Sequence, residues 1–180
     1  TDDNYSNAKI KGVNTSKIRE YLKKDGIPII AGFQGIDKNE RITTLGRGGS
    51  DYSAIVLAKY LKAIKCVIYT DVIGLMTTDP KIYKRAKKIK VISYEEMLEM
   101  SSLGSKVMQS NSVQDARLNR IDVNVKSSFI KNSGTLITKK KNITNNKIIT
   151  GISATKKDAK VTIVGVIDKP GIAASIFKPL

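Results

Sequence analysis

Residues 43–51 carry the chemistry that is easiest to interpret, with the sequence Thr-Thr-Leu-Gly-Arg-Gly-Gly-Ser-Asp. The three glycines allow positive φ angles and a close approach of the backbone to a ligand. Arg47 offers a planar guanidinium that can hold a carboxylate or a phosphate with two hydrogen bonds. Ser50 and Asp51 stand where a helical pattern begins, so their side chains could cap that helix or contact a ligand. The segment therefore predicts an anion-binding loop between a strand and a helix.

The composition excludes several other kinds of chemistry. The chain has 180 residues, no histidine and one cysteine, Cys66. It therefore cannot use a Ser-His-Asp triad, a histidine metal site or a disulfide framework. We expect Cys66 to be a buried free thiol in a strand. The phosphate-binding pattern Gly-x-x-x-x-Gly-Lys-Ser/Thr is absent, and Asp51 stands where the dinucleotide-binding pattern needs its third glycine.

The formal net charge of +16 leaves nucleic-acid binding open as an alternative that rests on charge alone. Basic residues spread along the chain and are densest at 81–90 and 139–141. Aromatic residues make up only 6% of the sequence and do not interleave with the lysines as in a base-stacking surface. We therefore expect no nucleic-acid partner, and solvated lysines that also attract anionic substrates. No apolar run approaches the ~18 residues of a membrane span and no signal peptide opens the chain, so we expect a cytoplasmic protein that binds no membrane.

Apolar patterns predict an α/β fold around a largely parallel central sheet. The short apolar runs at 27–33 and 66–70 are typical of buried parallel strands. Apolar residues between them recur with helical spacing, which predicts a helix over 51–64 and a βαβ unit. The pattern Ser93-Tyr-Glu-Glu96 predicts a capping box at the start of a helix that ends near Ser102. Further strands are expected at 8–13, 122–127 and 134–137, and further helices near 18–25 and from about Lys106 to Asn119.

Two pairs of residues are expected near phosphates because of their places along the chain. Thr70 and Asp71 end the predicted strand at 66–70, where open α/β sheets bind ligands. Lys106 and Val107 follow Gly104 at the predicted start of a helix, where N–H groups and an ammonium suit a phosphate. A strand-end turn and an exposed lysine remain the alternative interpretations.

Seven short motifs resemble, in order and in spacing, the aspartate kinase signature of the amino-acid kinase superfamily. They are residues 43–51 and the sequences Gly-Phe-Gln-Gly at 32–35, Ile-Tyr-Thr-Asp-Val at 68–72, Asp-Pro-Lys at 79–81, Ser-Tyr-Glu-Glu-Met at 93–97, Leu-Gly-Ser-Lys-Val at 103–107 and Ser-Ser-Phe at 127–129. The resemblance implies a three-layer αβα fold. It also implies ATP-dependent phosphorylation of the side-chain carboxylate of L-aspartate to 4-phospho-L-aspartate, the first step towards lysine, threonine and methionine.

The resemblance implies two sets of site residues and no protein-held metal. Arg47 and Asp51 would be the catalytic pair, with Arg47 on the α-carboxylate of aspartate and Asp51 on its α-ammonium, beside Phe33 and Ser50. The residues expected to contact ATP, carried with Mg²⁺, are Thr70, Asp71, Met76, Lys81, Lys106 and Val107. Met76 stands where the family usually has tyrosine, and Lys81 replaces an arginine, so both weaken the nucleotide contacts.

The resemblance also implies a domain organisation. Residues 1–137 would be the C-terminal, nucleotide-binding part of a kinase domain, 138–150 a linker, and 151–180 the start of an incomplete ACT regulatory domain. The family's upstream Lys-Phe-Gly-Gly segment has no counterpart in this chain, so we expect the isolated chain to be inactive. ACT domains imply a homo-oligomer of the full-length protein. Two alternatives stay open: a superfamily member that acts on glutamate, acetylglutamate or UMP, and a non-catalytic regulatory fragment.

Overall fold

The computed structural model describes residues 1–131, 133–139 and 149–154, and these contain a four-stranded sheet with the order β3–β5–β6–β4. The strands are β3 (Cys66–Thr70), β4 (Val91–Ser93), β5 (Val123–Ser127) and β6 (Thr135–Thr138). β3 pairs with β5 and β4 with β6 in parallel, whereas β5 and β6 are antiparallel. The predicted α/β class with a mostly parallel sheet is confirmed. Residues 140–148 of the predicted linker and 155–180 of the predicted ACT unit lie outside the described residues.

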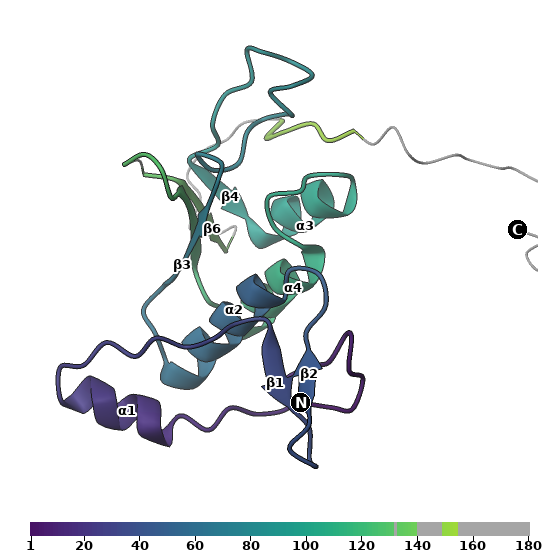
Figure 1. Cartoon of the computed structure of the whole chain (residues 1–180). Coiled ribbons are helices and arrows are strands. Elements are labelled where there is room, and N and C mark those ends of the chain that lie inside the picture. The colour runs from purple at the N-terminus through teal and green to yellow at the C-terminus, as the bar shows by residue number, and fades with distance from the viewer. Residues whose placement is uncertain (132, 140–148, 155–180) are drawn as a thin grey trace, which may run out of the picture.

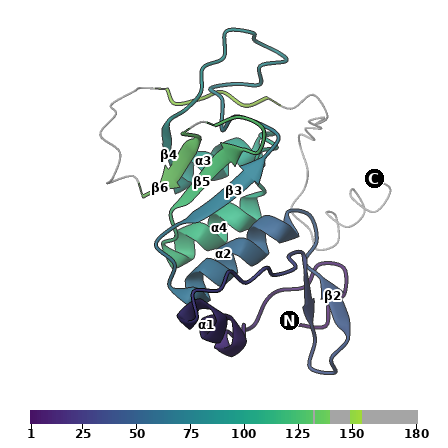
Figure 2. The same cartoon turned by 60° about the vertical axis from the view of Figure 1, so that its left-hand side comes forward.

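Among the described residues, helices pack on one face of this sheet. They are α2 (Gly49–Leu61), α3 (Tyr94–Ser102) and α4 (Ser110–Asn119), which lie behind the sheet in Figure 2. The front face carries no helix from the described part of the chain, so two of the three expected layers are present there. α2 leads into β3 and α4 leads into β5, and these strands are parallel. The two helices therefore run side by side in the same direction and begin at the same end of the sheet (Figure 1).

The hydrophobic core lies between the sheet and the helices. Cys66, Val123 and Ile137 are paired in register across β3, β5 and β6, and Ile92 of β4 continues the row. All four side chains are buried. Residues that are paired in register across neighbouring strands point to the same face of the sheet. Buried side chains of the helices pack against this row, among them Ile55, Met97 and Val113.

Cys66 is a buried free thiol at the start of β3, as predicted. Burial raises the pKa of this thiol to about 11. Because the thiolate is the reactive form, Cys66 is a structural residue at neutral pH.

Ser93 ends β4 and is at the same time the N-cap of α3, which confirms the predicted capping box. The Ser93 hydroxyl accepts a hydrogen bond from the Glu96 N–H at 3.1 Å, and the Glu96 carboxylate accepts one from the Ser93 N–H at 3.0 Å. These bonds satisfy two N–H groups that have no partner within the helix. The chain therefore passes from strand to helix without a loop, and Ile92 and Met97 enter the same core.

The prediction of a buried strand at residues 27–33 is wrong in this structure. The run forms no strand, and Ile27 and Ile29 are 89% and 96% exposed. The neighbouring β1 (Gln34–Ile36) instead pairs antiparallel with β2 (Ile42–Thr44) in a sheet of its own. The predicted βαβ unit is absent from the described residues for the same reason. An apolar run shows that burial is favourable, but it forms a buried strand only beside another strand and beneath a covering layer.

Two further predictions near the N-terminus have different outcomes. Residues 8–13 form no strand, so that prediction is also wrong; Ala8 instead donates its N–H to the Thr44 carbonyl and the chain then leaves the sheet. The predicted helix near 18–25 is present as α1 (Ser16–Lys23), which has no buried residue.

None of the helices in the described ranges has the length and apolar character that crossing a bilayer requires.

Asp37 fastens the β1–β2 hairpin to the N-terminal segment. Its carboxylate accepts hydrogen bonds from the N–H groups of Asn39 and Arg41, at 2.8 and 2.9 Å, and from the Tyr5 hydroxyl at 3.0 Å. The Arg41 guanidinium also pairs with Asp37 and lies over the Tyr5 ring. Burial by itself would raise the pKa of Asp37, but these donors outweigh it and lower the pKa to about 2.

The substitution Asp37→Asn should make the stability of the fold less sensitive to acid. Because the pKa of Asp37 is lower in the folded state than its ordinary value of 3.8, its contribution is present above about pH 4 and is lost as the pH falls towards 2. Urea denaturation at pH 5, 3 and 2 would measure this. Asp25→Asn, at an exposed carboxylate, is the control and should keep the wild-type pH dependence. Equal losses of stability in Asp37→Asn and wild type would contradict the assignment.

Candidate functional site

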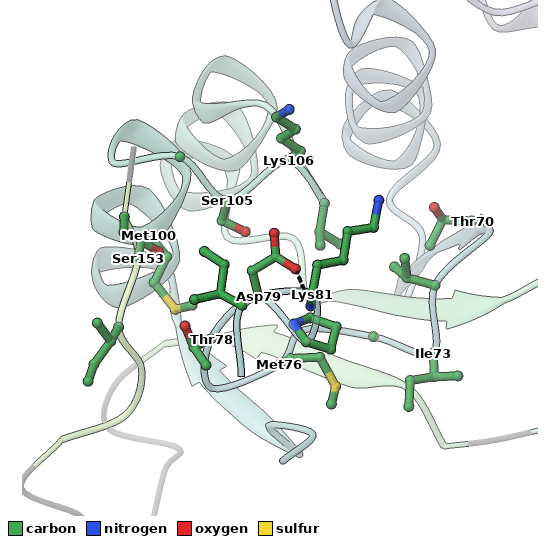
Figure 3. A pocket seen from close by; sticks show the side chains of 18 of the residues that line it. Thr70, Ile73, Met76, Thr78, Asp79, Lys81, Met100, Ser105, Lys106 and Ser153 are labelled. Atoms are coloured by element: carbon green, nitrogen blue, oxygen red, sulfur yellow. Dashed lines mark hydrogen bonds between the residues drawn. The ribbon is translucent and has the colours of Figure 1, made fainter. Parts of the chain in front are cut away.

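A pocket of about 790 Å³ opens at the carboxyl end of β3. Its walls come from the loop after β3, the segment between α3 and α4, and the short stretch 152–154. Figure 3 shows Thr70 and Ile73 on one side of it and Met100 and Ser153 on the other. All the residues expected to contact a nucleotide line this pocket: Thr70, Asp71, Met76, Lys81, Lys106 and Val107. The structure thus brings together residues that are up to 37 positions apart, from 70 to 107.

Thr70 and Asp71 form the end of β3 at the pocket wall. The Thr70 hydroxyl donates to Asp71 Oδ1 at 3.1 Å, and the Thr70 carbonyl accepts from the Ser128 N–H at 2.8 Å. The second bond joins the last residue of β3 to the first residue after β5. Asp71 is exposed, so its carboxylate can face solvent or a ligand.

The loop after β3 folds back on itself and presents Lys81 to the pocket. Asp79 Oδ1 accepts the Lys81 N–H at 2.8 Å, drawn as the dashed line in Figure 3. Such a bond from an aspartate to the second residue after it fixes a tight turn. In the same view the ammonium groups of Lys81 and Lys106 both lie towards the top, on the side away from Met76. Two ammonium groups on one side of a pocket suit the phosphates of a nucleotide.

The prediction that Lys106 and Val107 open a helix is wrong, because α4 begins at Ser110. Gly104 has a φ of +117°, and the Ser105 N–H donates to the Met100 carbonyl at 2.8 Å, which closes α3 and turns the chain. Residues 105–109 then cross the pocket as an irregular segment. Lys106 is exposed there, while Val107 packs against the core. Any phosphate contact by Lys106 therefore comes from its ammonium and not from the start of a helix.

The glycine-rich segment connects a strand to a helix, as predicted, but the strand is β2, which lies inside the predicted loop, and not the run at 27–33. Gly46 and Gly48 have φ angles of +73° and +74°, and Gly48 is the N-cap of α2. Phe33 packs against this turn: its carbonyl accepts the Leu45 N–H at 2.9 Å, and a Cβ on Gly49 would lie 2.9 Å from Phe33 Cδ2. Phe33 is therefore beside the loop that carries Arg47.

Arg47, Ser50 and Asp51 stand at the start of α2. Arg47 and Ser50 are exposed, and Asp51 is half-buried in the first helical turn. No side chain caps this helix, so the interpretation of Ser50 or Asp51 as a cap does not hold here. Burial raises the pKa of the Asp51 carboxyl. A cationic group placed beside Asp51 would favour its ionised form again.

The two sets of predicted site residues adjoin each other through Gly48 and the start of α4. The Ser112 hydroxyl donates to the Gly48 carbonyl at 3.4 Å, and a Cβ on Gly48 would overlap the Gln109 side chain. Gln109 follows Lys106 and Val107 by a few residues and is the N-cap of α4. The N-termini of α2 and α4 therefore lie together, and helix N-termini attract anions. A negatively charged group that passes between the loop and the pocket would be stabilised there.

The described ranges 1–131, 133–139 and 149–154 contain no group of three or more histidine, cysteine or carboxylate side chains that could hold a metal ion. Asp71 and Asp79 line the pocket as single carboxylates. They fit a Mg²⁺ ion that arrives on phosphates, because Mg²⁺ in such sites uses one or two carboxylates and completes its shell with phosphate oxygens and water.

Several residues of the pocket carry no sequence signal that predicts a place in a site. Ile73 and Thr78 belong to a loop whose course depends on its surroundings, and Met100 looks like an ordinary core residue of α3. The expected domain organisation places 152–154 in the ACT unit and not beside these residues. The place of this stretch in the pocket depends on contacts with distant parts of the chain.

Comparison with known proteins agrees with this arrangement. The chain matches the model of the amino acid kinase family over residues 1–127. It is 47% identical to the aspartokinase of Helicobacter pylori and 46% identical to the aspartate kinase of Pseudomonas putida, in alignments that cover all of this chain and 45% and 44% of those proteins. The structure of E. coli aspartokinase III in complex with aspartate and ADP matches with a TM-score of 0.70 at 36% identity, over 81% of this chain and 33% of that one.

The chain therefore belongs to the amino acid kinase family, whose model matches most of its length. Within that family it is similar to the aspartokinases from end to end, and it spans a little under half the length of these relatives. The resemblance seen in the seven sequence motifs is thereby confirmed.

The substitution Gly48→Ala should lower the free energy of unfolding by about 1 to 3 kcal/mol. Alanine is strained at the positive φ of this position, and its Cβ would overlap the Gln109 side chain. The matched control is Gly12→Ala, since a Cβ there would meet only the Tyr60 hydroxyl at 4.0 Å. Urea denaturation of both variants measures the difference. Equal stability of the two variants would show that the contact between the loop and α4 is unimportant.

Proposed function

We propose that this chain is part of an aspartate kinase, which transfers the γ-phosphoryl group of ATP to the side-chain carboxylate of L-aspartate and yields 4-phospho-L-aspartate and ADP. One observation supports the proposal most strongly. The pocket at the end of β3 is lined by all the residues expected to hold a nucleotide, and its segment with Lys106 and Val107 leads into α4, which contacts the loop that carries Arg47. The relatives that match the whole chain are aspartokinases, and the E. coli enzyme was crystallised with aspartate and ADP.

The reaction suits a site without histidine. An aspartate carboxylate is ionised at neutral pH, so its oxygen can attack the γ-phosphorus without a general base. The new bond joins that oxygen to phosphorus, and the bond from phosphorus to the bridging oxygen of ADP breaks. The protein then has two tasks, which are to position both substrates and to neutralise phosphate charge. The two lysines and two helix N-termini described above can serve the second task.

Arg47 and Asp51 are proposed to hold the amino-acid substrate. The exposed Arg47 guanidinium would pair with the α-carboxylate through two hydrogen bonds. The half-buried Asp51 would pair with the α-ammonium, whose charge offsets the burial of the Asp51 carboxylate. Phe33 and Ser50 would bound the same site beside the glycine-rich turn. The side-chain carboxylate of the substrate is then left to face the phosphates.

The nucleotide is proposed to occupy the pocket with its phosphates near Lys81 and Lys106. Thr70 and Asp71 would contact it at the end of β3, with Met76 and Val107 as apolar walls. Mg²⁺ bound to the phosphates would supply further neutralisation of charge. We extend the proposal to the full-length protein, in which residues 151–180 would begin an ACT unit that joins subunits into a homo-oligomer.

Arg47→Ala, made in a full-length protein that contains this chain, should lower kcat/KM for aspartate by about 100-fold or more while ATP binding changes little. The loss of a bidentate, charge-assisted contact has this magnitude. Arg47→Lys keeps the charge without the planar fork and should recover only part of the activity. Arg85→Ala, in an exposed loop, is the control. Steady-state kinetics with aspartate as the varied substrate decide the matter; an unchanged kcat/KM in Arg47→Ala would refute this role.

Lys106→Met should weaken the binding of Mg-ADP by about tenfold, because one charged contact to the phosphates is lost. Lys65→Met is the matched control, since Lys65 is an exposed lysine before the other end of β3. Calorimetric titration of each variant with Mg-ADP provides the comparison. Equal affinities for the two variants would remove Lys106 from the nucleotide site.

A further inference from the structure

Residues 149–154 return to the kinase fold and form one wall of the pocket. The segment is yellow-green in Figure 1 and passes beside α3, far along the chain from the other pocket residues. Ile152, Ser153 and Ala154 line the pocket. Figure 3 places Ser153 next to Met100 and opposite Thr70. This wall is therefore built from chain that the sequence motifs did not include.

Contacts at consecutive residues attach the segment to the pocket. The Ile152 N–H donates to the Thr77 carbonyl at 2.7 Å, and the Thr150 hydroxyl donates to Glu96 Oε1 at 2.5 Å. Gly151 lies between these bonds, and a Cβ placed on it would be 3.0 Å from the Met100 sulfur and 3.1 Å from the Thr77 carbonyl oxygen. Thr77 follows the pocket residue Met76 directly. The segment is thus held against the loop after β3 and against α3 together.

Glu96 uses its two carboxylate oxygens for different purposes. Oε2 accepts the N–H and the hydroxyl of Ser93 in the capping box, while Oε1 accepts the Thr150 hydroxyl. Removing the Thr150 hydroxyl therefore leaves the cap of α3 in place. The bond to an ionised carboxylate is stronger than one between neutral groups, which suits a contact that fixes a loop.

The chemistry of this wall differs from that of the lysine side of the pocket. Ile152, Ala154 and Met100 present apolar surface, whereas Lys81 and Lys106 present charge. A nucleotide has one flat, mostly apolar end and one highly charged end. The apolar wall matches the base, and the lysines match the phosphates.

We propose that Thr150 is a positioning residue for nucleotide binding, which fixes residues 149–154 against Glu96 so that this wall receives the base of a nucleoside di- or triphosphate. The inference rests on the proposed function, since it requires a nucleotide in this pocket. The inference identifies the side of the pocket that holds the base. It also identifies Thr150 as a residue that acts by positioning this wall through Glu96, without touching the nucleotide. A wall that is already fixed lowers the entropy lost when the base binds.

Thr150→Val should weaken the binding of Mg-ADP to the 180-residue chain by about tenfold, the effect of losing one hydrogen bond to a charged group. Thr150→Ser keeps the hydroxyl and should bind Mg-ADP like the wild type. The binding of Mg-tripolyphosphate, which has no base, should be equal in all three proteins. Calorimetric titration with each ligand, together with a thermal melt of each protein, measures these effects. Amide hydrogen exchange at 149–154 should also slow when Mg-ADP binds to the wild type.

The possible outcomes separate this inference from the proposed function. If the wild type binds neither ligand, the nucleotide site itself is refuted and the inference with it. If the wild type binds Mg-ADP and Thr150→Val binds it equally well, the inference alone is overturned. If Thr150→Val weakens both ligands to the same degree, Thr150 supports the fold in general and does not position a wall for the base. A tenfold loss for Mg-ADP alone, recovered in Thr150→Ser, supports the inference.

Discussion

The parallel pairing of β3 with β5 is the constraint on which the rest of the structure depends. Two parallel strands end at the same edge of a sheet, and the helices that lead into them must begin at that edge. α2 and α4 obey this rule, and contacts from Gln109 and Ser112 to Gly48 hold their N-termini together. The loop after β3 and the segment before α4 consequently meet, and the pocket forms between them. A single backbone pairing thus brings the glycine-rich loop and the residues proposed to contact a nucleotide into one region.

The charges at this edge are arranged to receive negative groups. Lys81, Lys106 and Arg47 come from three different loops, and the N-termini of α2 and α4 add partial positive charge. The carboxylates at the same edge differ in their surroundings, since Asp71 is exposed and Asp51 is half-buried. The proposed phosphoryl transfer to an ionised acceptor requires none of these groups to gain or lose a proton, so the arrangement is consistent with that proposal.

Short sequence patterns predicted the structure correctly where neighbouring residues alone determine it. The capping box of Ser93 and Glu96, the existence of a strand at 66–70 and the glycine-rich turn were predicted correctly, because neighbouring residues decide caps, extended backbone and positive φ. The expected burial of the strand at 66–70 is wrong in part, because β3 is at the edge of its sheet and Tyr69 is 65% exposed. The same reasoning failed where distant parts of the chain decide. Residues 27–33 have the composition of a buried strand but lie exposed, and α4 begins at Ser110, later than predicted. The wall at 149–154 depends on Glu96 and Thr77, which no local pattern connects to it.

The exposed apolar run at 27–33 has a consequence for how the chain behaves at high concentration. Ile27 and Ile29 present branched apolar side chains to water, as an edge strand does when it joins copies of a protein into aggregates. Pro28 lies between them and cannot donate a backbone hydrogen bond to a neighbouring strand. The net charge of +16 adds mutual repulsion, which salt screens. The exposed apolar side chains of this segment favour association and the net charge opposes it, so low ionic strength favours the dispersed form.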